Sequence, residues 1–273
     1  MKRLILFVAL VSMGWMAAAQ SYSDSFYEAM NRDDLKDQRR VLDEWGKAAP
    51  DDVEWYIARY NYFVNRAMVS MDVPQEDGEV ETIYLVANNL ADSGLAVIDK
   101  AIGLFPLRLD LRFGKIYFLG EAKRWNAFEE EIIGTLNYSE LIAHEWEFPN
   151  TEGEGRALMI EGVHDYLLTM MDAITDHEHL TADDSAMVMR VRRVAMRKVQ
   201  VFSGDMMAVN IVGVTYAIMK EYEKSLKYFK RAEKLAPDDE AVLRNLLDAY
   251  TAMGNKKEAK LYQERLDKLG GSE

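Results

Sequence analysis

The chain has 273 residues, of which 49% are hydrophobic, and it contains no cysteine. Disulfide bonds and lipid attachment through a cysteine are therefore excluded, and the hydrophobic core alone must hold the fold together. The formal net charge of −13 at pH 7 makes the chain repel phosphate backbones, so we expect no nucleic-acid partner.

The first 19 residues have the pattern of a secretory signal peptide. Lys2 and Arg3 precede an apolar run, Leu4–Val11, and the small residues Ala17–Ala19 form a cleavage motif. The alternative, a retained membrane anchor, requires about 20 apolar residues, and this run is shorter. The pattern predicts a cleaved signal peptide over 1–19, an exported protein of the periplasm or cell envelope, and no stable membrane span after cleavage.

Apolar residues at helical spacing predict a series of helices along the body of the chain. The first two cover 34–47 and 53–67, with Pro50 between them. A third covers 90–104 and ends before Pro106, because proline cannot continue a helix. Further helices are predicted over 109–119, over 125–133, over 157–174 and from Thr181 onward.

The helix predicted over 53–67 is rich in aromatic residues. In a stack of helices such residues usually form interhelical packing, and the alternative is an exposed platform that stacks on sugars or peptides. We interpret them as packing. The residues concerned are Trp55, Tyr56, Tyr60, Tyr62 and Phe63.

Near 69–87 the periodicity changes from helical to alternating. Val69, Met71 and Val73 alternate with polar residues, and 80–86 is rich in β-branched and aromatic residues. The pattern predicts a small β-hairpin insertion. A disordered loop is the alternative, because an isolated hairpin is only marginally stable. An ordered hairpin would be a candidate contact surface.

The four histidines do not have the spacing of a metal site. A zinc site on a helix would show two histidines four residues apart with a glutamate between them. His177 and His179 are two residues apart and would point to different helix faces. We expect structural or solvated roles, with no metal and no cofactor. An enzymatic interpretation rests only on His144, Glu145 and His164, with no nucleophile motif or phosphate loop to support it.

The helix that begins at Thr181 carries two local patterns. Asp184 follows Thr181 at the spacing of a capping box. Farther along, Arg190, Arg193 and Arg197 form a basic row. In an acidic chain we expect this row to form intramolecular ion pairs on a solvated face. Binding of an anionic lipid or an acidic peptide is the alternative.

Residues 205–269 repeat themselves at a fixed offset of 34 positions, which is typical of a helix–turn–helix repeat. A glycine in the first copy would allow two helices to approach closely, and Pro237 ends the second helix. Asp238 and Asp239 then provide capping oxygens for the next helix. The matched pairs are Val209 and Leu243, Val212 and Leu246, Gly213 and Leu247, Tyr216 and Tyr250, Tyr228 and Tyr262, Ala232 and Leu266, and Leu235 and Leu269.

This segment resembles two consecutive tetratricopeptide repeats. Residues at the family's small, aromatic and proline signature positions are Gly213, Tyr216, Phe229, Ala232 and Pro237. The second copy departs from the pattern, as terminal capping repeats often do. Its residues there are Leu247, Gln263 and Leu266.

The resemblance implies an all-α fold, a tetratricopeptide-like right-handed α-solenoid of about ten to twelve helices in antiparallel pairs. The predicted hairpin is a small insertion in it. We expect a degenerate repeat-like helical region over 20–204, two tetratricopeptide repeats over 205–269 and a flexible tail over 270–273.

The resemblance also implies a concave groove, lined by the first helix of each repeat, that receives an extended peptide or a partner helix. The family's clamp for a terminal carboxylate needs several Lys, Arg and Asn residues, and only Asn210, Arg244 and Asn245 are near, so we do not expect that specificity. The groove positions in the two repeats are Asn210, Val214, Ala217, Arg244, Asp248 and Thr251.

These patterns favour a non-catalytic adaptor that binds a protein or peptide partner in the periplasm or cell envelope. The alternative is a carbohydrate- or glycan-binding helical solenoid that uses exposed aromatic residues. The aromatic residues that motivate this alternative are Trp55, Tyr56, Tyr60, Trp125 and Trp146.

Overall fold

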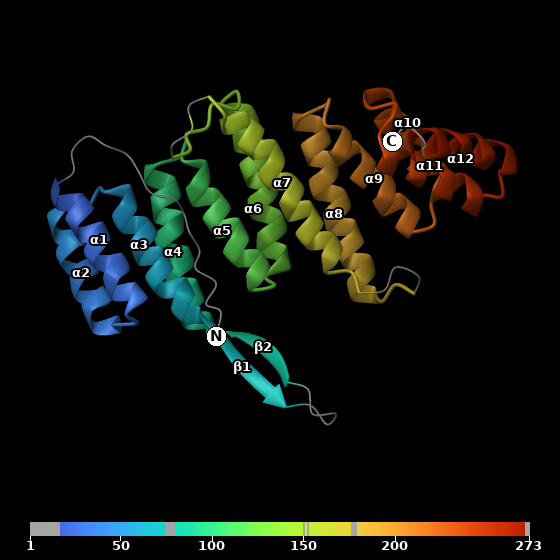
Figure 1. Ribbon diagram of the computed structural model, residues 1–273. Helices are drawn as coiled ribbons and strands as arrows, with labels where there is room; N and C mark the ends of the chain where they lie inside the picture. Colours follow the sequence, from blue (N-terminus) through green and yellow to red (C-terminus); the bar gives the residue numbers. More distant parts are fainter. Residues whose placement is uncertain (1–16, 75–79, 150, 152, 176–178, 271–273) are drawn as a thin grey trace. The chain divides into compact units, whose positions relative to one another are not determined.

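The computed structural model describes residues 17–74, 80–149, 151, 153–175 and 179–270. Within these ranges the chain forms twelve helices and two strands (Figure 1). The all-α class and the small hairpin insertion are thus confirmed. Residues 1–16 of the predicted signal peptide, His177 and the tail 271–273 lie outside the described part of the chain.

The chain divides into two compact units, which we describe separately. The first comprises 1–128 and 145–156, and the second comprises 129–144 and 157–273. The elements of the first unit are α1 (Ala17–Asn31), α2 (Leu35–Ala48), α3 (Val53–Ala67), β1 (Met68–Pro74), β2 (Val80–Val86), α4 (Asn88–Leu104), α5 (Leu109–Glu121) and the start of α6 (Trp125–Leu141). Those of the second unit are the rest of α6, nearly all of α7 (Gly155–Asp172), α8 (Ala182–Val201), α9 (Met206–Ile218), α10 (Tyr222–Leu235), α11 (Glu240–Ala252) and α12 (Lys256–Gly270).

Short polar side chains begin many of these helices, as the sequence predicts. An aspartate or threonine oxygen accepts a hydrogen bond from a backbone N–H in the first turn, which satisfies a donor that the helix leaves free. Pro50, Pro106 and Pro237 follow the ends of α2, α4 and α10. The capping residues are Asp34 for α2, Asp52 for α3, Thr181 for α8, Asp205 for α9 and Asp239 for α11.

The aromatic residues of α3 form interhelical packing. Tyr60 is 1% exposed, and its hydroxyl donates a hydrogen bond to the carbonyl oxygen of Gly114 in α5 at 2.8 Å. The indole N–H of Trp55 donates to the carbonyl oxygen of Leu42 in α2 at 2.8 Å. Gly46 faces that indole so closely that a Cβ there would lie 2.7 Å from the ring. The packing interpretation of this helix is therefore confirmed.

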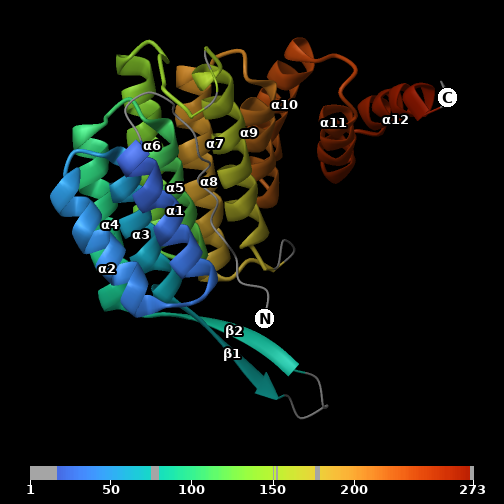
Figure 2. The same ribbon diagram turned by 60° about the vertical axis from the view of Figure 1, so that its left-hand side comes forward.

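The predicted hairpin is present as the antiparallel pair β1 and β2. Its register pairs Val69 with Leu85 and Met71 with Ile83. In both views the two strands extend away from the helices of the first unit (Figures 1 and 2). Val69, Met71 and Leu85 are each about half exposed, so this part of the hairpin offers apolar side chains to solvent.

The core of the second unit includes an apolar stripe along α8 and at its carboxyl end. Helical spacing brings these side chains onto one face, where they are buried against neighbouring helices. Burial of each such side chain stabilises the fold by about 1.5–3 kcal/mol. The residues of the stripe are Val188, Val191, Ala195, Val199 and Phe202, all less than 9% exposed.

Candidate partner-binding site

The α9–α10 hairpin depends on a close approach at one glycine. Gly213 in α9 lies against the ring of Phe229 in α10, and a Cβ at position 213 would be 2.5 Å from two carbons of that ring. Phe229 is 1% exposed and has little space into which to move. The predicted role of Gly213 is thus confirmed, because only a residue without a side chain fits here.

A pair of tyrosines occurs once in each repeat with nearly the same geometry. The rings of Tyr216 and Tyr228 are stacked at a centroid distance of 5.6 Å and an interplanar angle of 19°. Those of Tyr250 and Tyr262 are stacked at 5.7 Å and 12°. The offset of 34 residues found in the sequence is therefore also a structural repeat.

The second hairpin packs on the first through polar contacts as well as apolar ones. Asn245 in α11 donates a side-chain hydrogen bond to Asn210 in α9 at 3.0 Å. Glu233 in α10 accepts hydrogen bonds from Arg265 and from the hydroxyl of Tyr262, both in α12. These contacts fix the position of α11 and α12 relative to α9 and α10.

Glu233 remains ionised in this setting. Burial raises the pKa of its carboxyl group, but the hydrogen bond from Arg265 and the charge of Lys230 outweigh this effect. The pKa is therefore held below its ordinary value. The cluster is a structural ion-pair network between repeats, in which Lys230 and Arg265 both pair with Glu233.

Arg192 in α8 joins the helix before the repeats to the first of them. Its guanidinium group donates to the carbonyl oxygen of Thr215 at 2.8 Å and to the hydroxyl of Thr215 at 3.1 Å. The guanidinium carbon also lies 3.8 Å from the centroid of the Tyr216 ring. Sequence reasoning missed this residue, because it singled out the three neighbouring arginines of the basic row. The only signal was its position beside the apolar stripe of α8.

The basic row itself is used within the chain, as predicted. Arg190 and Arg193 both donate to the carboxylate of Glu129, which is 7% exposed, with contacts at 3.1 and 2.8 Å. Arg197 donates to Asn137 at 2.6 Å and also pairs with Glu140. These arginines tie α8 to α6 within the second unit. Their charges are not available to a ligand without breaking those pairs.

The six residues assigned to the groove lie on α9 and α11, at corresponding positions one repeat apart. Asn210 is engaged by Asn245 and therefore supports packing between the helices. Arg244 is exposed and pairs with Glu240 on the same helix. Such an exposed pair contributes about 0–1 kcal/mol, so Arg244 is free to change partner at little cost.

The other four positions have no hydrogen bond or ion pair described for them. Asp248 and Thr251 are exposed, and Val214 and Ala217 are half-buried. A spacing of three residues places Val214 and Ala217 on one face of α9, and Asp248 and Thr251 on one face of α11. We refer to Val214, Ala217, Asp248 and Thr251 as the α9–α11 face. It combines apolar, hydroxyl and carboxylate groups, which suits recognition of a peptide or a helix.

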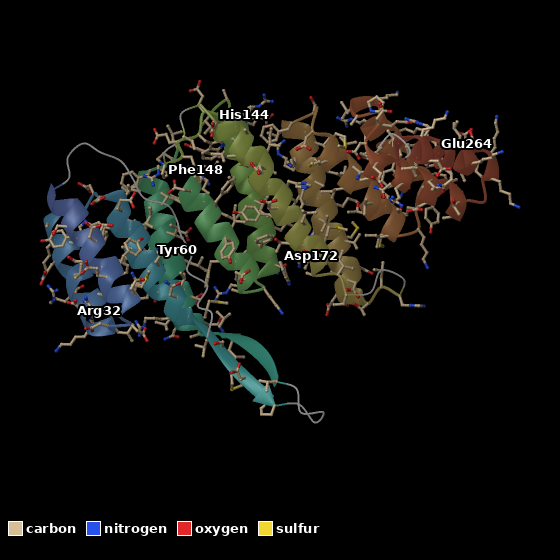
Figure 3. The ribbon with its side chains drawn as sticks, in the orientation of Figure 1. Arg32, Tyr60, His144, Phe148, Asp172 and Glu264 are labelled. Atoms are coloured by element: carbon tan, nitrogen blue, oxygen red, sulfur yellow. The ribbon has the colours of Figure 1, made fainter. Side chains whose placement is uncertain are left out.

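His144 has a structural environment (Figure 3). Its Nδ1 lies 2.9 Å from the hydroxyl oxygen of Ser139, and its ring centroid lies 4.8 Å from that of Phe202. In the part of the chain that the structure describes, no group of three or more His, Asp or Glu residues could hold a metal ion. The geometry around His144 is that of a packed helix end.

The aromatic residues that motivated the glycan alternative are mostly enclosed. Tyr56, Tyr60 and Trp146 are at most 6% exposed. Trp55 is half-buried, and its indole N–H donates a hydrogen bond to the backbone carbonyl oxygen of Leu42. The ring of Trp125 makes an edge-to-face contact with that of Phe128. A sugar-binding platform requires exposed ring faces, and these residues do not combine to form one.

The geometry defines a class of protein, the helical-repeat proteins, in which hairpins of antiparallel helices recur at a fixed period. Residues 208–239 match the tetratricopeptide repeat family, and they cover most of α9 and α10. The chain thus contains a tetratricopeptide repeat over residues 208–239. No curated protein matches the sequence. Among the described residues, none of the helices has the length and apolarity required to cross a membrane.

Several solved structures are similar to this chain at low sequence identity. PilW, a type IV pilus biogenesis factor, is 11% identical with a TM-score of 0.42, over 93% of this chain and 94% of that one. PilF of Pseudomonas aeruginosa is 13% identical with a TM-score of 0.38, over 93% and 92% of the two chains. A thermophilic tetratricopeptide protein of Thermus thermophilus is 16% identical with a TM-score of 0.37, over 66% and 83%. None of these likenesses is high enough to assign a partner to this chain.

Proposed function

We propose that this protein is a non-catalytic adaptor of the periplasm or cell envelope that binds a peptide or helix of a partner protein on the α9–α11 face. One observation supports the proposal above the others. The positions of Val214 and Ala217 correspond to those of Asp248 and Thr251 one repeat later. No side-chain hydrogen bond or ion pair is described for any of these four residues. Side chains that are not fully buried and have no such polar contact are available for a partner.

Affinity capture with a surface variant tests this function. The variant combines Val214→Glu with Asp248→Lys, and both sites can hold a charged side chain because neither is fully buried. The tagged protein is used to capture partners from detergent-solubilised envelope, followed by mass spectrometry. We expect one stoichiometric protein that the variant no longer retains.

A matched control separates loss of binding from a general charge effect. Leu261→Glu combined with Glu264→Lys makes the same changes of charge as the variant, at two exposed positions of α12 (Glu264 is labelled in Figure 3). This control should retain the partner, and both variants should keep the helicity and melting temperature of the parent. Equal recovery with the parent and the α9–α11 variant would refute the assignment of the face.

The location is proposed on separate grounds, from the charged, apolar and small-residue segments of residues 1–19. Amino-terminal sequencing of the protein from a fractionated cell tests it. We expect the mature chain to begin at Gln20 and to occur in the envelope fraction. An intact amino terminus in the cytoplasmic fraction would contradict the export of the protein.

A further inference from the structure

The β1–β2 hairpin has two outer edges that can accept a further strand. Within the described part of the chain the sheet consists of these two strands, so neither outer edge is paired with a third. In an antiparallel pair, successive residues direct their N–H and C=O groups alternately toward the partner strand and away from it. At the base of the hairpin, the amide of Ala87 donates to the carbonyl oxygen of Ala67 at 2.8 Å. This bond shows which residues direct their backbone groups inward.

The two outer edges differ in the donors that they present. Ala67 and Ala87 continue the register of the hairpin, so alternation from this bonded pair makes the even-numbered strand residues point outward. On β1 the last of these is Pro74, which has no N–H and therefore limits pairing with another strand. β2 contains no proline. We refer to the outward backbone groups of Val80, Thr82 and Tyr84 as the β2 edge.

One face of the hairpin offers apolar side chains beside this edge. The register places Val69 opposite Leu85, and Met71 lies two residues along β1 on the same face. All three side chains are about half exposed. The strands extend away from the helices of the first unit (Figures 1 and 2). A strand added beside β2 would continue this face and cover apolar area that now contacts water.

The charge of the hairpin selects among the possible occupants. Residues 68–86 contain five acidic residues and no Lys or Arg. Two copies of the hairpin would repel each other if their strands were brought together, and an anionic lipid surface would repel each copy. A segment that carries Lys or Arg would be attracted. The charge therefore favours a basic protein segment over a second copy or a membrane.

We propose that the β2 edge binds an extended segment of a partner protein, in which aliphatic residues alternate with Lys or Arg, as an added antiparallel strand. Backbone hydrogen bonds to Val80, Thr82 and Tyr84 hold the segment. Its aliphatic side chains lie on the face of Leu85, and its basic side chains lie on the other face. The hairpin belongs to the first unit and the α9–α11 face to the second, so this proposal does not depend on the proposed function.

The first test compares two synthetic peptides of seven residues, the length of β2. Val alternates with Lys in one peptide, starting and ending with Val, and Glu replaces Lys in the other. Each is labelled at its amino terminus and titrated with the full chain while fluorescence anisotropy is recorded. We expect the Val–Lys peptide to bind roughly tenfold more tightly than the Val–Glu peptide.

Two methylated forms of the Val–Lys peptide test the backbone pairing. One carries N-methyl groups on the amides of its Lys residues, and the other carries them on the amides of its Val residues. In the antiparallel arrangement, residues opposite Thr82 and Tyr84 exchange hydrogen bonds with β2, and these are the Lys residues. Methylation of the Lys amides should therefore weaken binding at least tenfold, whereas methylation of the Val amides should have little effect.

Three variants of the protein locate the peptide. Thr82→Pro removes an outward amide of β2 without removing a bond inside the hairpin, and it should weaken the Val–Lys peptide roughly tenfold. Ser70→Pro is the matched control, because it removes an outward amide from the other edge of the same hairpin, and it should leave the affinity unchanged. Thr82→Ala keeps the amide and should also leave the affinity unchanged.

Four results would overturn the proposal. The first is the absence of saturable binding of the Val–Lys peptide at about 1 mM. The second is equal affinity of the two methylated peptides, and the third is equal loss of affinity with Thr82→Pro and Ser70→Pro. The fourth is dimerisation of the chain, or its binding to phosphatidylcholine vesicles, that Thr82→Pro abolishes, since this would assign the edge to a second copy or to lipid. The methylated peptides are titrated with the unaltered protein, so they keep the test decisive if Thr82→Pro disturbs the hairpin.

Discussion

The close packing at Gly213 leads to a prediction that opposes simple helix propensity. Alanine in place of glycine within a helix usually stabilises a protein by about 0.5–1 kcal/mol. At position 213, however, the new Cβ would lie 2.5 Å from two carbons of the Phe229 ring. Neither the ring nor the helix can move freely, because Phe229 is 1% exposed. Overpacking of this kind costs about 1–3 kcal/mol, and at so short a distance we expect the upper part of that range.

The two effects together predict that Gly213→Ala lowers the free energy of unfolding by about 1–2 kcal/mol. Gly134→Ala is the matched control, because Gly134 also lies within a helix of the second unit and a Cβ there would meet nothing within 4 Å. It should raise the free energy of unfolding by about 0.5–1 kcal/mol. Urea denaturation followed by circular dichroism measures both changes. The double change Gly213→Ala with Phe229→Leu should recover part of the loss, with a coupling of at least about 0.5 kcal/mol.

Equal or greater stability of Gly213→Ala would refute this reasoning. It would mean that the α9–α10 interface adjusts at no cost, and that the glycine is not required by the packing. If Gly213→Ala and Phe229→Leu changed the free energy of unfolding additively, this would also refute the reasoning, because additivity is expected of sites that do not contact each other.

Two further predictions concern α8. Hydrogen bonds from Thr181 and Thr175 lower the pKa of Asp184 to about 2, so the stability that this carboxylate contributes is present above its unfolded pKa and lost as the pH falls toward 2. NMR titration should show this low pKa of Asp184 in the parent and a higher pKa in Thr181→Ala. The free energy of unfolding of Thr181→Ala should also fall by about 1 kcal/mol, because the substitution removes the helix cap. An unchanged pKa would contradict the capping-box origin of the shift. Arg192→Lys should lower the melting temperature measurably. The planar guanidinium group of Arg192 donates two hydrogen bonds to Thr215 and stacks on the ring of Tyr216 at the same time, and an ammonium group cannot make both contacts. Arg244→Lys, at an exposed position, should change it little, and equal effects of the two changes would show that the contacts of Arg192 do not stabilise the fold.

The candidate site was only partly predictable. The α9 and α11 positions follow from the repeat period, and the structure leaves Asp248 and Thr251 exposed. Asn210 belongs to the same set of positions, yet its side chain is taken up by Asn245, 35 residues away.

By itself, the sequence determined several of the helix starts and stops and showed which elements repeat. Asp239 caps α11 and Pro237 follows α10, and both features depend on residues close together in the chain. Tyr216 and Tyr228 recur 34 residues later as Tyr250 and Tyr262. Only the tertiary structure decided which charges are matched and which surfaces are left open. Arg193 finds Glu129 at a separation of 64 residues, and Tyr60 finds Gly114 at a separation of 54. Periodicity identifies the face of a helix that is buried, but the partner on that face is chosen by packing between distant segments.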